Sequence, residues 1–257
     1  MPWMSLNVFG FGCGTLTAEF ARVMEGGEGH VTMPIPAFLI EHPKGRAVFD
    51  TGLNPACQHD PAARIGEEMA AAYRIGFHPG QEISAQLEAI GRDPGKIDLL
   101  INSHFHFDHV GGNALVPNAT MVVQRREWEA SRDPDKAALH GYDPRDFDVG
   151  HTIRLVDGEF DVFGDGSVTC LPTPGHSPGH QSLRLRLASG DVVLAADACY
   201  FCRTLRDRRL PRHVDDRDAM LASLDRLEAL ERGGAKIVFG HDPAFRSLVP
   251  APPEAMA

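Results

Sequence analysis

The way strand-like and helical segments alternate along this chain of 257 residues predicts a layered α/β fold. Short runs rich in Val, Ile, Leu and Phe are typical of buried strands. Between several of them, apolar residues repeat at helical spacing, and acidic residues or glycine stand where such segments would begin or end. Because alternating strands and helices pack as layers around a shared core, these observations favour a layered α/β architecture.

The expected strands are short, apolar and spread over the whole chain. They lie at residues 5–11, 37–41, 47–49, 97–101, 120–123, 168–171, 182–187, 192–196 and 236–239. Several of these runs end at a histidine, an aspartate or a glycine. Loops that follow strands often carry binding and catalytic residues on a rigid scaffold, so such residues are expected at the strand ends.

Helices are expected between the strands. Ile83, Leu87 and Ile90 repeat at helical spacing, and a longer pattern of Met and Leu covers 220–230, with acidic residues before it and glycines after it. Residues 62–73 and 126–132 are further helix candidates, and 133–150, rich in Asp, Pro, Gly and His, is expected to be a surface loop. No repeat, low-complexity segment or long linker divides the chain, so residues 1–257 are predicted to form a single domain.

Composition narrows the classes of partner. A chain of this length with 43% hydrophobic residues can bury a full core, and a formal net charge of −10 argues against nucleic acid. No stretch approaches the roughly 20 apolar residues of a membrane span. The start of the chain lacks a basic region before its apolar residues, and the cysteines are odd in number and irregularly spaced; both favour the cytoplasm. The five cysteines are Cys13, Cys57, Cys170, Cys199 and Cys202.

A dense group of candidate metal ligands follows the apolar run 97–101. His104, His106, Asp108 and His109 stand within six residues, and imidazole together with carboxylate suits zinc and its neighbours. On an extended segment His104 and His106 point to the same face, because they are two residues apart. The glycines at 111 and 112 mark a bend, so Asp108 and His109 can point to a second place nearby. The spacing favours two adjacent metals over one.

Three other strand ends offer ligands of the same kind. His176 lies in a loop stiffened by prolines and glycines at 172–179. Asp197 follows the apolar run 192–196, and His241 follows 237–240. One such histidine alone would more often be structural. Four strand ends with ligand side chains predict a common metal centre.

These motifs resemble the metallo-β-lactamase fold of metal hydrolases, and within it the N-acyl-homoserine lactonases. The resemblance extends over residues 37–242 and rests on His104-x-His106-x-Asp108-His109, Pro174-Gly-His176-Ser-Pro-Gly-His180, Asp197-x-x-Tyr200 and Gly240-His241-Asp242. It implies an αββα four-layer sandwich and a dinuclear metal-dependent enzyme that hydrolyses lactones. Zinc is the expected metal, although iron, cobalt and manganese suit the same ligands.

The resemblance also implies a role for each ligand residue. His104, His106 and His176 would hold the first metal, and Asp108, His109 and His241 the second. Asp197 would bridge the two ions. In such a site, coordination lowers the pKa of water from 15.7 to about 7. Asp108 would then serve as general acid and base.

Tyr200 would stabilise the oxyanion that forms from the attacked carbonyl. The alternative for Tyr200 is a core aromatic residue. Phe107, which alternates with the ligands, is expected to touch the substrate or shield the metals. In lactonases the region that matches residues 53–81 covers the metal site, so the expected pocket also includes Tyr73, Ile75 and Phe77. For the last three, simple packing onto the body of the protein is an equal alternative.

Some assignments stay open at this level. Asp50 would either hydrogen-bond a ligand histidine or form a structural turn, and His180 is expected to be structural. The Cys199-x-x-Cys202 pair is not expected to have a redox or metal role. Residues 1–38 could pair subunits in a homodimer or border the pocket.

The expected activity is hydrolysis of N-acyl-homoserine lactones, which quenches bacterial quorum signals. Another small lactone, such as pyridoxolactone, fits the same chemistry. A diiron redox protein is disfavoured, because such proteins usually have Glu in place of His106 and a flavin domain, which this chain lacks. A catalytically silent metal-binding member is disfavoured because every ligand is present together with Asp108.

Overall fold

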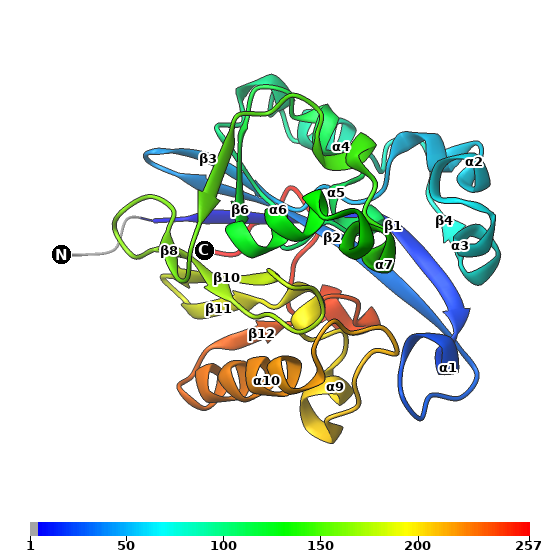
Figure 1. Cartoon of the computed structure of the whole chain (residues 1–257). Helices are drawn as coiled ribbons and strands as arrows, with labels where there is room; N and C mark the ends of the chain where they lie inside the picture. Colours follow the sequence, from blue (N-terminus) through cyan, green and yellow to red (C-terminus); the bar gives the residue numbers. More distant parts are fainter. Residues whose placement is uncertain (1–4) are drawn as a thin grey trace.

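Two β-sheets packed face to face form the centre of the molecule, and helices cover both outer faces (Figure 1). The computed structural model describes residues 5–257. The larger sheet has the strand order β4 (Arg74–Gly76), β1 (Asn7–Glu19), β2 (His30–His42), β3 (Gly45–Phe49), β5 (Leu99–Ile101), β6 (Thr120–Gln124) and β7 (Ile153–Val156). The smaller sheet has the order β12 (Lys236–Val238), β11 (Gly190–Leu194), β10 (Gln181–Leu187), β9 (Val168–Pro172) and β8 (Phe160–Asp161). The predicted αββα sandwich is confirmed.

The helices divide between the two outer layers. In Figure 1, α4, α6 and α7 lie on the side of the larger sheet, and α9 and α10 lie beneath the smaller one. The helices are α1 (Phe20–Val23), α2 (Pro61–Ile65), α3 (Glu67–Ala72), α4 (Ile83–Ala89), α5 (Phe107–Val110), α6 (Arg125–Arg132), α7 (Pro134–His140), α8 (Pro144–Phe147), α9 (Cys202–Asp207) and α10 (Arg217–Arg232). Short 3₁₀ turns connect several of these elements.

Three apolar layers fill the spaces between the four structural layers. Successive residues of a strand face opposite sides of its sheet. Val8 in β1 therefore belongs to the cluster between the sheets, whereas Phe9 belongs to the cluster under the outer helices. In β11, Val192 faces the other sheet and Val193 packs with Leu224 of α10. This alternation explains why the central strands are apolar on both faces.

Two predicted segments differ from the structure. The helix expected at 62–73 is divided into α2 and α3 at Gly66, whose φ of 85° does not fit a continuous helix. The loop expected at 133–150 instead contains α7 and α8. Asp133 and Asp143 cap these helices, and a proline occupies the first turn of each. The sequence prediction missed the caps because Asp and Pro also favour turns.

The sequence prediction also missed how far β1 and β2 extend. Each strand has 13 residues, and the pair projects beyond the rest of the sheet toward α1 (Figure 1). The paired residues of the outer half include Thr17 and Thr32, whose hydroxyls lie 2.9 Å apart. Polar residues there hid the strands from a search for apolar runs. β4, β7 and β8 were missed as well because they are short and lie at or near sheet edges.

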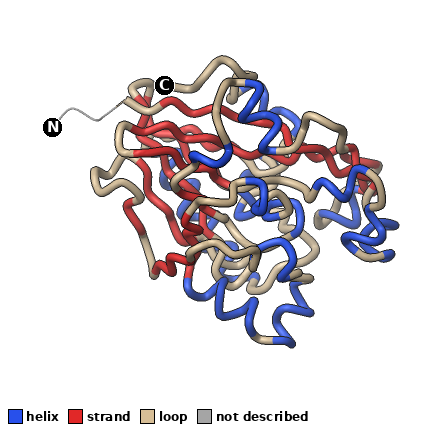
Figure 2. Tube along the Cα trace, turned by 90° about the horizontal axis from the view of Figure 1, so that it is seen from above, coloured by secondary structure: helices blue, strands red, loops and turns tan. Residues whose placement is uncertain are grey.

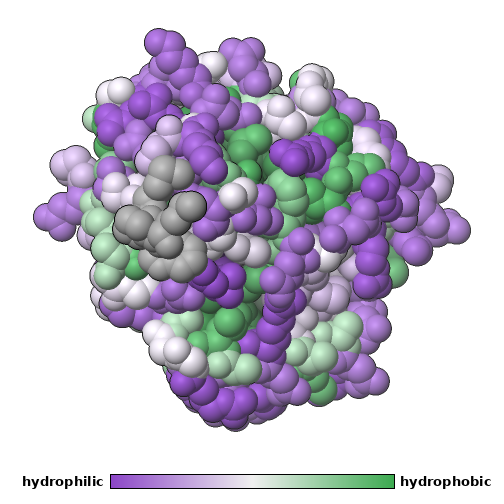
Figure 3. Space-filling model, turned by 90° about the vertical axis from the view of Figure 1, so that its left-hand side faces the viewer, coloured by the Kyte–Doolittle hydropathy of each residue, from purple (hydrophilic) through white to green (hydrophobic). Residues whose placement is uncertain are grey.

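The two ends of the described chain lie close together (Figure 2). The backbone of Met256 exchanges two hydrogen bonds with that of Val8, at 2.9 and 3.0 Å. Residues 1–4, part of the segment 1–38 considered for subunit pairing, lie outside the described residues. Among residues 5–257, no helix has both the length and the apolar character needed to cross a membrane. Polar residues separate small apolar groups on the face shown in Figure 3.

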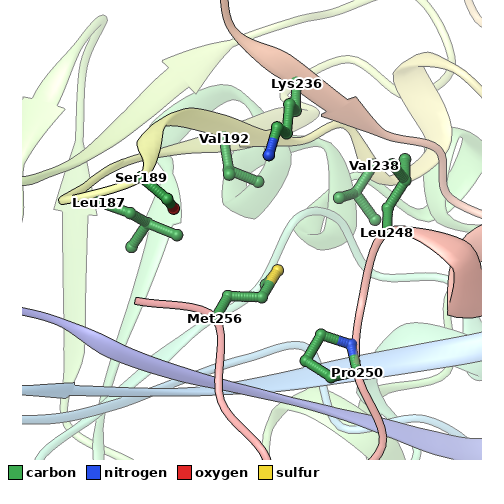
Figure 4. Close-up of a pocket in the computed structure, with 8 residues that line it drawn as sticks. All are labelled: Leu187, Ser189, Val192, Lys236, Val238, Leu248, Pro250 and Met256. Atoms are coloured by element: carbon green, nitrogen blue, oxygen red, sulfur yellow. The ribbon is translucent and has the colours of Figure 1, made fainter.

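A cavity of about 130 Å³ lies between the smaller sheet and the C-terminal segment (Figure 4). Leu187, Val192 and Val238 contribute apolar walls, and Lys236 and Met256 point toward the open space. None of the predicted site residues lines this cavity. It is therefore not the candidate functional site.

Candidate metal centre

The predicted ligands meet because their strands end at the same edge of the sandwich. β9 and β11 both run antiparallel to β10, and β12 runs parallel to β11, so these three strands point the same way. His176, Asp197 and His241 follow their carboxyl ends. The loop after β5 approaches from the larger sheet, where the backbone N–H of Gln181 donates to the carbonyl of Ser103 at 2.9 Å.

Three imidazole nitrogens converge in the first ligand group. Nδ1 of His106 lies 2.9 Å from Nε2 of His104 and 2.9 Å from Nε2 of His176. Asp197 completes the group, since its Oδ2 lies 3.2 Å from Nε2 of His176 and 3.8 Å from Nε2 of His104. All four ligand atoms lie within 4.8 Å of one another.

The second group stands beside the first and uses the other oxygen of Asp197. Asp197 Oδ1 lies 3.0 Å from Nε2 of His241 and 3.2 Å from Nε2 of His109. Oδ2 of Asp108 is 3.7 Å from each of the same two nitrogens. Asp197 therefore has one carboxylate oxygen directed to each group, which is the arrangement expected of a residue shared between two cations.

The donor atoms fit divalent metal ions. Nδ1 of His109 is hydrogen-bonded to Asp50, and Nδ1 of His241 is hydrogen-bonded to the carbonyl of Pro34, both at 2.9 Å. Each ring that donates at Nδ1 presents the lone pair of Nε2 to the centre. Nε2 of His109 and Oδ1 of Asp197 are buried without a hydrogen-bond partner. Tetrahedral zinc, with its nitrogen ligands at 2.0–2.1 Å, holds neighbouring nitrogens about 3.3 Å apart. The nitrogens of the first ligand group lie 2.9 Å apart, which is close to this spacing.

Burial favours the neutral form of the first three histidines. It lowers the pKa of His104 and of His176 well below the usual range, and that of His106 to about 4. Neutral imidazole is the form that binds a metal. Burial would also lower the pKa of His109, but the charges of Asp197 and Asp108 outweigh this effect and raise it. A cation at the second group would replace that proton.

Asp50 holds two of the ligand rings through a hydrogen-bonded chain. Oδ2 of Asp50 accepts from Nδ1 of His109 at 2.9 Å and from the Ser103 hydroxyl at 2.7 Å. The same hydroxyl lies 2.9 Å from Nδ1 of His104. Such partners orient ligand rings and fix their tautomers. Of the two alternatives that the sequence left open for Asp50, the structure favours the hydrogen bond to a ligand histidine.

His180 and Glu127 also support the centre. His180, expected to be structural, accepts a hydrogen bond from the backbone N–H of Asp197 at 3.1 Å. Glu127 was not recognised from the sequence. It is fully buried and contacts the loops on both sides of the first ligand group. The sequence contains only a weak indication of Glu127. It stands three residues before Ala130, so both lie on the same, buried face of a short helix.

The predicted catalytic residues lie at the same centre. Asp108 is 6% exposed in α5. The ring of Tyr200 is centred 5.6 Å from that of His176 and 4.9 Å from that of His241. Burial and the nearby Asp197 carboxylate raise the pKa of Tyr200 well above its usual range. The hydroxyl of Tyr200 therefore stays protonated and can donate a hydrogen bond.

The four residues predicted to line the pocket have different surroundings. Phe107, Tyr73 and Ile75 are partly buried. Burial, with the charges of Asp108 and Asp197, raises the pKa of Tyr73 to about 12, so its phenol lies within electrostatic range of the centre. Phe77 is 4% exposed and packs in the core against Gly14. For Phe77 the structure favours the packing alternative.

Comparisons with known proteins agree with this geometry. The model of the metallo-beta-lactamase superfamily matches residues 31–241. The N-acyl homoserine lactonase AttM of Azorhizobium caulinodans is 37% identical over 239 residues, covering 90% of each chain. The N-acyl homoserine lactonase AiiA of Bacillus thuringiensis subsp. kurstaki is 32% identical over 216 residues, covering 82% of each.

A solved structure supports the same relationship. It is an N-acyl homoserine lactone hydrolase with the product N-hexanoyl-L-homoserine at its catalytic metal centre, 27% identical to this chain. The alignment has a TM-score of 0.86 and covers 98% of this chain and 100% of the other. The fold, the convergent ligand groups and these relatives together show that the chain belongs to the metallo-β-lactamase superfamily, in its branch of N-acyl homoserine lactonases.

Proposed function

We propose that this protein hydrolyses the ester bond of N-acyl-homoserine lactones, with two divalent metal ions held at the edge where its two sheets meet. The observation that carries the proposal is the division of the Asp197 carboxylate between two ligand groups. The relatives named as lactonases support the choice of substrate. Zinc suits the imidazole and carboxylate donors best.

The proposed ligands follow the two groups. His104, His106 and His176 would hold one ion, and Asp108, His109 and His241 the other, with Asp197 shared. Bound there, the ions supply Lewis acidity and lower the pKa of water toward 7. The side chains of the protein perform the remaining steps.

Asp108 is the proposed proton carrier. Its carboxylate is buried and equally distant from the two histidines of its group, which supports a role beside the reacting atoms. It would take a proton from the attacking water and return it to the alkoxide oxygen of the opened ring. This is general acid–base catalysis, typically a contribution of about 10²–10⁴ in rate.

Tyr200 is the proposed donor to the oxyanion. Its ring lies beside His176 and His241, one from each ligand group, so its hydroxyl can reach substrate placed over both. The raised pKa of Tyr200 keeps that hydroxyl protonated. A fixed donor aimed at developing negative charge stabilises the transition state more than the ground state.

Tyr73, Ile75 and Phe107 are the proposed pocket residues. They are partly buried and come from two segments, the strand β4 with the residue before it and the first turn of α5. Their apolar surface would contact the acyl chain. We further propose that residues 1–257 act as one domain, because both sheets contribute ligands and neither could hold the metals alone.

The test is a lactone panel assayed with zinc-loaded protein. We expect turnover of hexanoyl and decanoyl homoserine lactones to exceed that of pyridoxolactone, and a chelator to abolish it until zinc is restored. Asp108→Asn should lower kcat by about 10²–10⁴, and Tyr200→Phe by about 10²–10³.

Asp146→Asn is the matched control for Asp108→Asn. Asp146 is also a buried carboxylate, but its partners are Arg64 and Asn54, neither of which is a proposed metal ligand. Its substitution should leave kcat within about threefold of the original. A zinc-loaded protein that opens none of the lactones would disprove the proposal, and higher activity on pyridoxolactone would reassign the substrate.

A further inference from the structure

One buried carboxylate joins the two loops of the first ligand group. Glu127, at the start of α6, is 0% exposed and accepts four hydrogen bonds. Its Oε1 accepts from the backbone N–H of Phe105 at 3.0 Å and from the Tyr142 hydroxyl at 2.7 Å. Its Oε2 accepts from the Ser177 hydroxyl and from the backbone N–H of Gly179, both at 2.8 Å.

Each oxygen of Glu127 serves a different ligand loop. Phe105 stands between His104 and His106, whereas Ser177 and Gly179 follow His176. The backbone of Glu127 also packs closely against the loop that follows His176. A Cβ on Gly179 would lie 2.2 Å from the backbone nitrogen of Glu127, so only glycine fits there. The loops are 70 residues apart in sequence, yet their ligand nitrogens lie 2.9 Å apart.

We propose that Glu127 is a positioning residue of the metal centre, whose carboxylate sets the separation between loop 104–106 and loop 176–179. The inference rests on the proposed metal ligands. Glu127 would touch neither substrate nor metal. It would act by holding the three histidines of the first group at the spacing that one ion requires.

The pattern of donors explains why a carboxylate is needed. Each oxygen of Glu127 meets one hydroxyl and one backbone N–H. A hydroxyl can rotate and accept a hydrogen bond, but a backbone N–H can only donate. A glutamine has one oxygen and one NH₂ group, so in either orientation its NH₂ faces a backbone N–H. Glutamine at position 127 would therefore hold one loop and release the other.

The test is the zinc affinity of Glu127→Gln, measured with a competing chelator. The original protein should bind two equivalents of zinc. We expect the variant to bind one equivalent normally and the other at least about 10-fold more weakly, in the range known for partners of ligand residues. Asp146→Asn, a buried carboxylate outside both loops, should bind zinc like the original. A folded Glu127→Gln with two unchanged affinities would overturn the proposal.

A second pair of variants decides the question if Glu127→Gln does not fold. Ser177→Ala and Tyr142→Phe each delete one hydroxyl that donates to Glu127, but only Ser177 lies in a ligand loop. Ser177→Ala should weaken one zinc equivalent, and Tyr142→Phe should change neither. Equal effects of the two variants would overturn the positioning role alone. An original protein that binds no zinc would overturn the metal centre as well.

Discussion

The backbone N–H of Asp197 donates a hydrogen bond to Nε2 of His180 at 3.1 Å. Nδ1 of His180 lies 2.9 Å from the Thr173 hydroxyl, which lies 2.8 Å from that of Ser182, and Ser182 donates to the carbonyl of Ala195. This chain of donors fixes a proton on Nδ1 and leaves Nε2 as the acceptor. Burial lowers the pKa of His180 to about 3, so the ring stays neutral. His180 thus supports the residue shared by both ligand groups.

Replacing His180 should therefore affect both metals. We expect His180→Ala to weaken binding of both zinc equivalents and to lower kcat/KM by about 10–100-fold, because the backbone of Asp197 loses its fixed acceptor. Zinc titration and lactone kinetics measure the two effects. His151→Gln, at another buried histidine whose ring faces the carbonyl of Val116 and no proposed ligand, is the control and should leave both unchanged. Weakening of a single equivalent would contradict a role through Asp197.

Asp50→Asn should weaken the second zinc site. An asparagine at position 50 has one acceptor oxygen where the aspartate has two, while the His109 ring, the Ser103 hydroxyl and the Ser103 backbone all need acceptors. We expect about a 10–100-fold loss of affinity for one zinc equivalent. Calorimetric titration of the metal-free protein measures it. Unchanged zinc affinity would show that Asp50 has only the structural role in a turn that the sequence also allowed.

His151 should make the folded state less stable in acid. Burial lowers its folded pKa below the usual histidine value of about 6.5, and its Nε2 lies 3.1 Å from the carbonyl of Val116. Below the unfolded pKa, the unfolded chain binds a proton that the folded protein does not, so the free energy of unfolding falls as the pH falls below about 6.5. The stability difference between the original protein and His151→Gln should shrink over that range. Denaturant unfolding at pH 8 and pH 5 tests this; a difference that is constant with pH would be evidence against it.

Thiol reactivity should be confined to one cysteine in the folded protein. All five cysteines are free, and only Cys202 is exposed. Burial raises the pKa of Cys13 and of Cys170 to about 12, which leaves almost no reactive thiolate. A thiol reagent should label one equivalent in the native state and five in denaturant. Cys202→Ser should remove the native equivalent, and fast labelling of that variant would contradict the structure.

The sequence by itself determined the central strands and the candidate ligands. Apolar runs identified the central strands, because a strand covered on both faces is apolar throughout, as in β11 with Val192 and Val193. The polar residues that end these runs identified His176, Asp197 and His241. Local spacing separated His104 and His106 from Asp108 and His109, because an extended segment followed by a bend sends the two pairs to different points.

Only the tertiary structure decided which residues hydrogen-bond those ligands and the loops that carry them. The bonds from Glu127 to Phe105 and Gly179, and from Asp50 to His109, join residues between 22 and 59 positions apart. The use of one Asp197 oxygen by each group, and the burial of Phe77 against Gly14, likewise depend on how the two sheets pack. A local sequence pattern predicts only the conformation of the segment that contains it. The partner of a buried polar group is chosen by the fold, since any distant donor that the packing brings within about 3 Å can satisfy it.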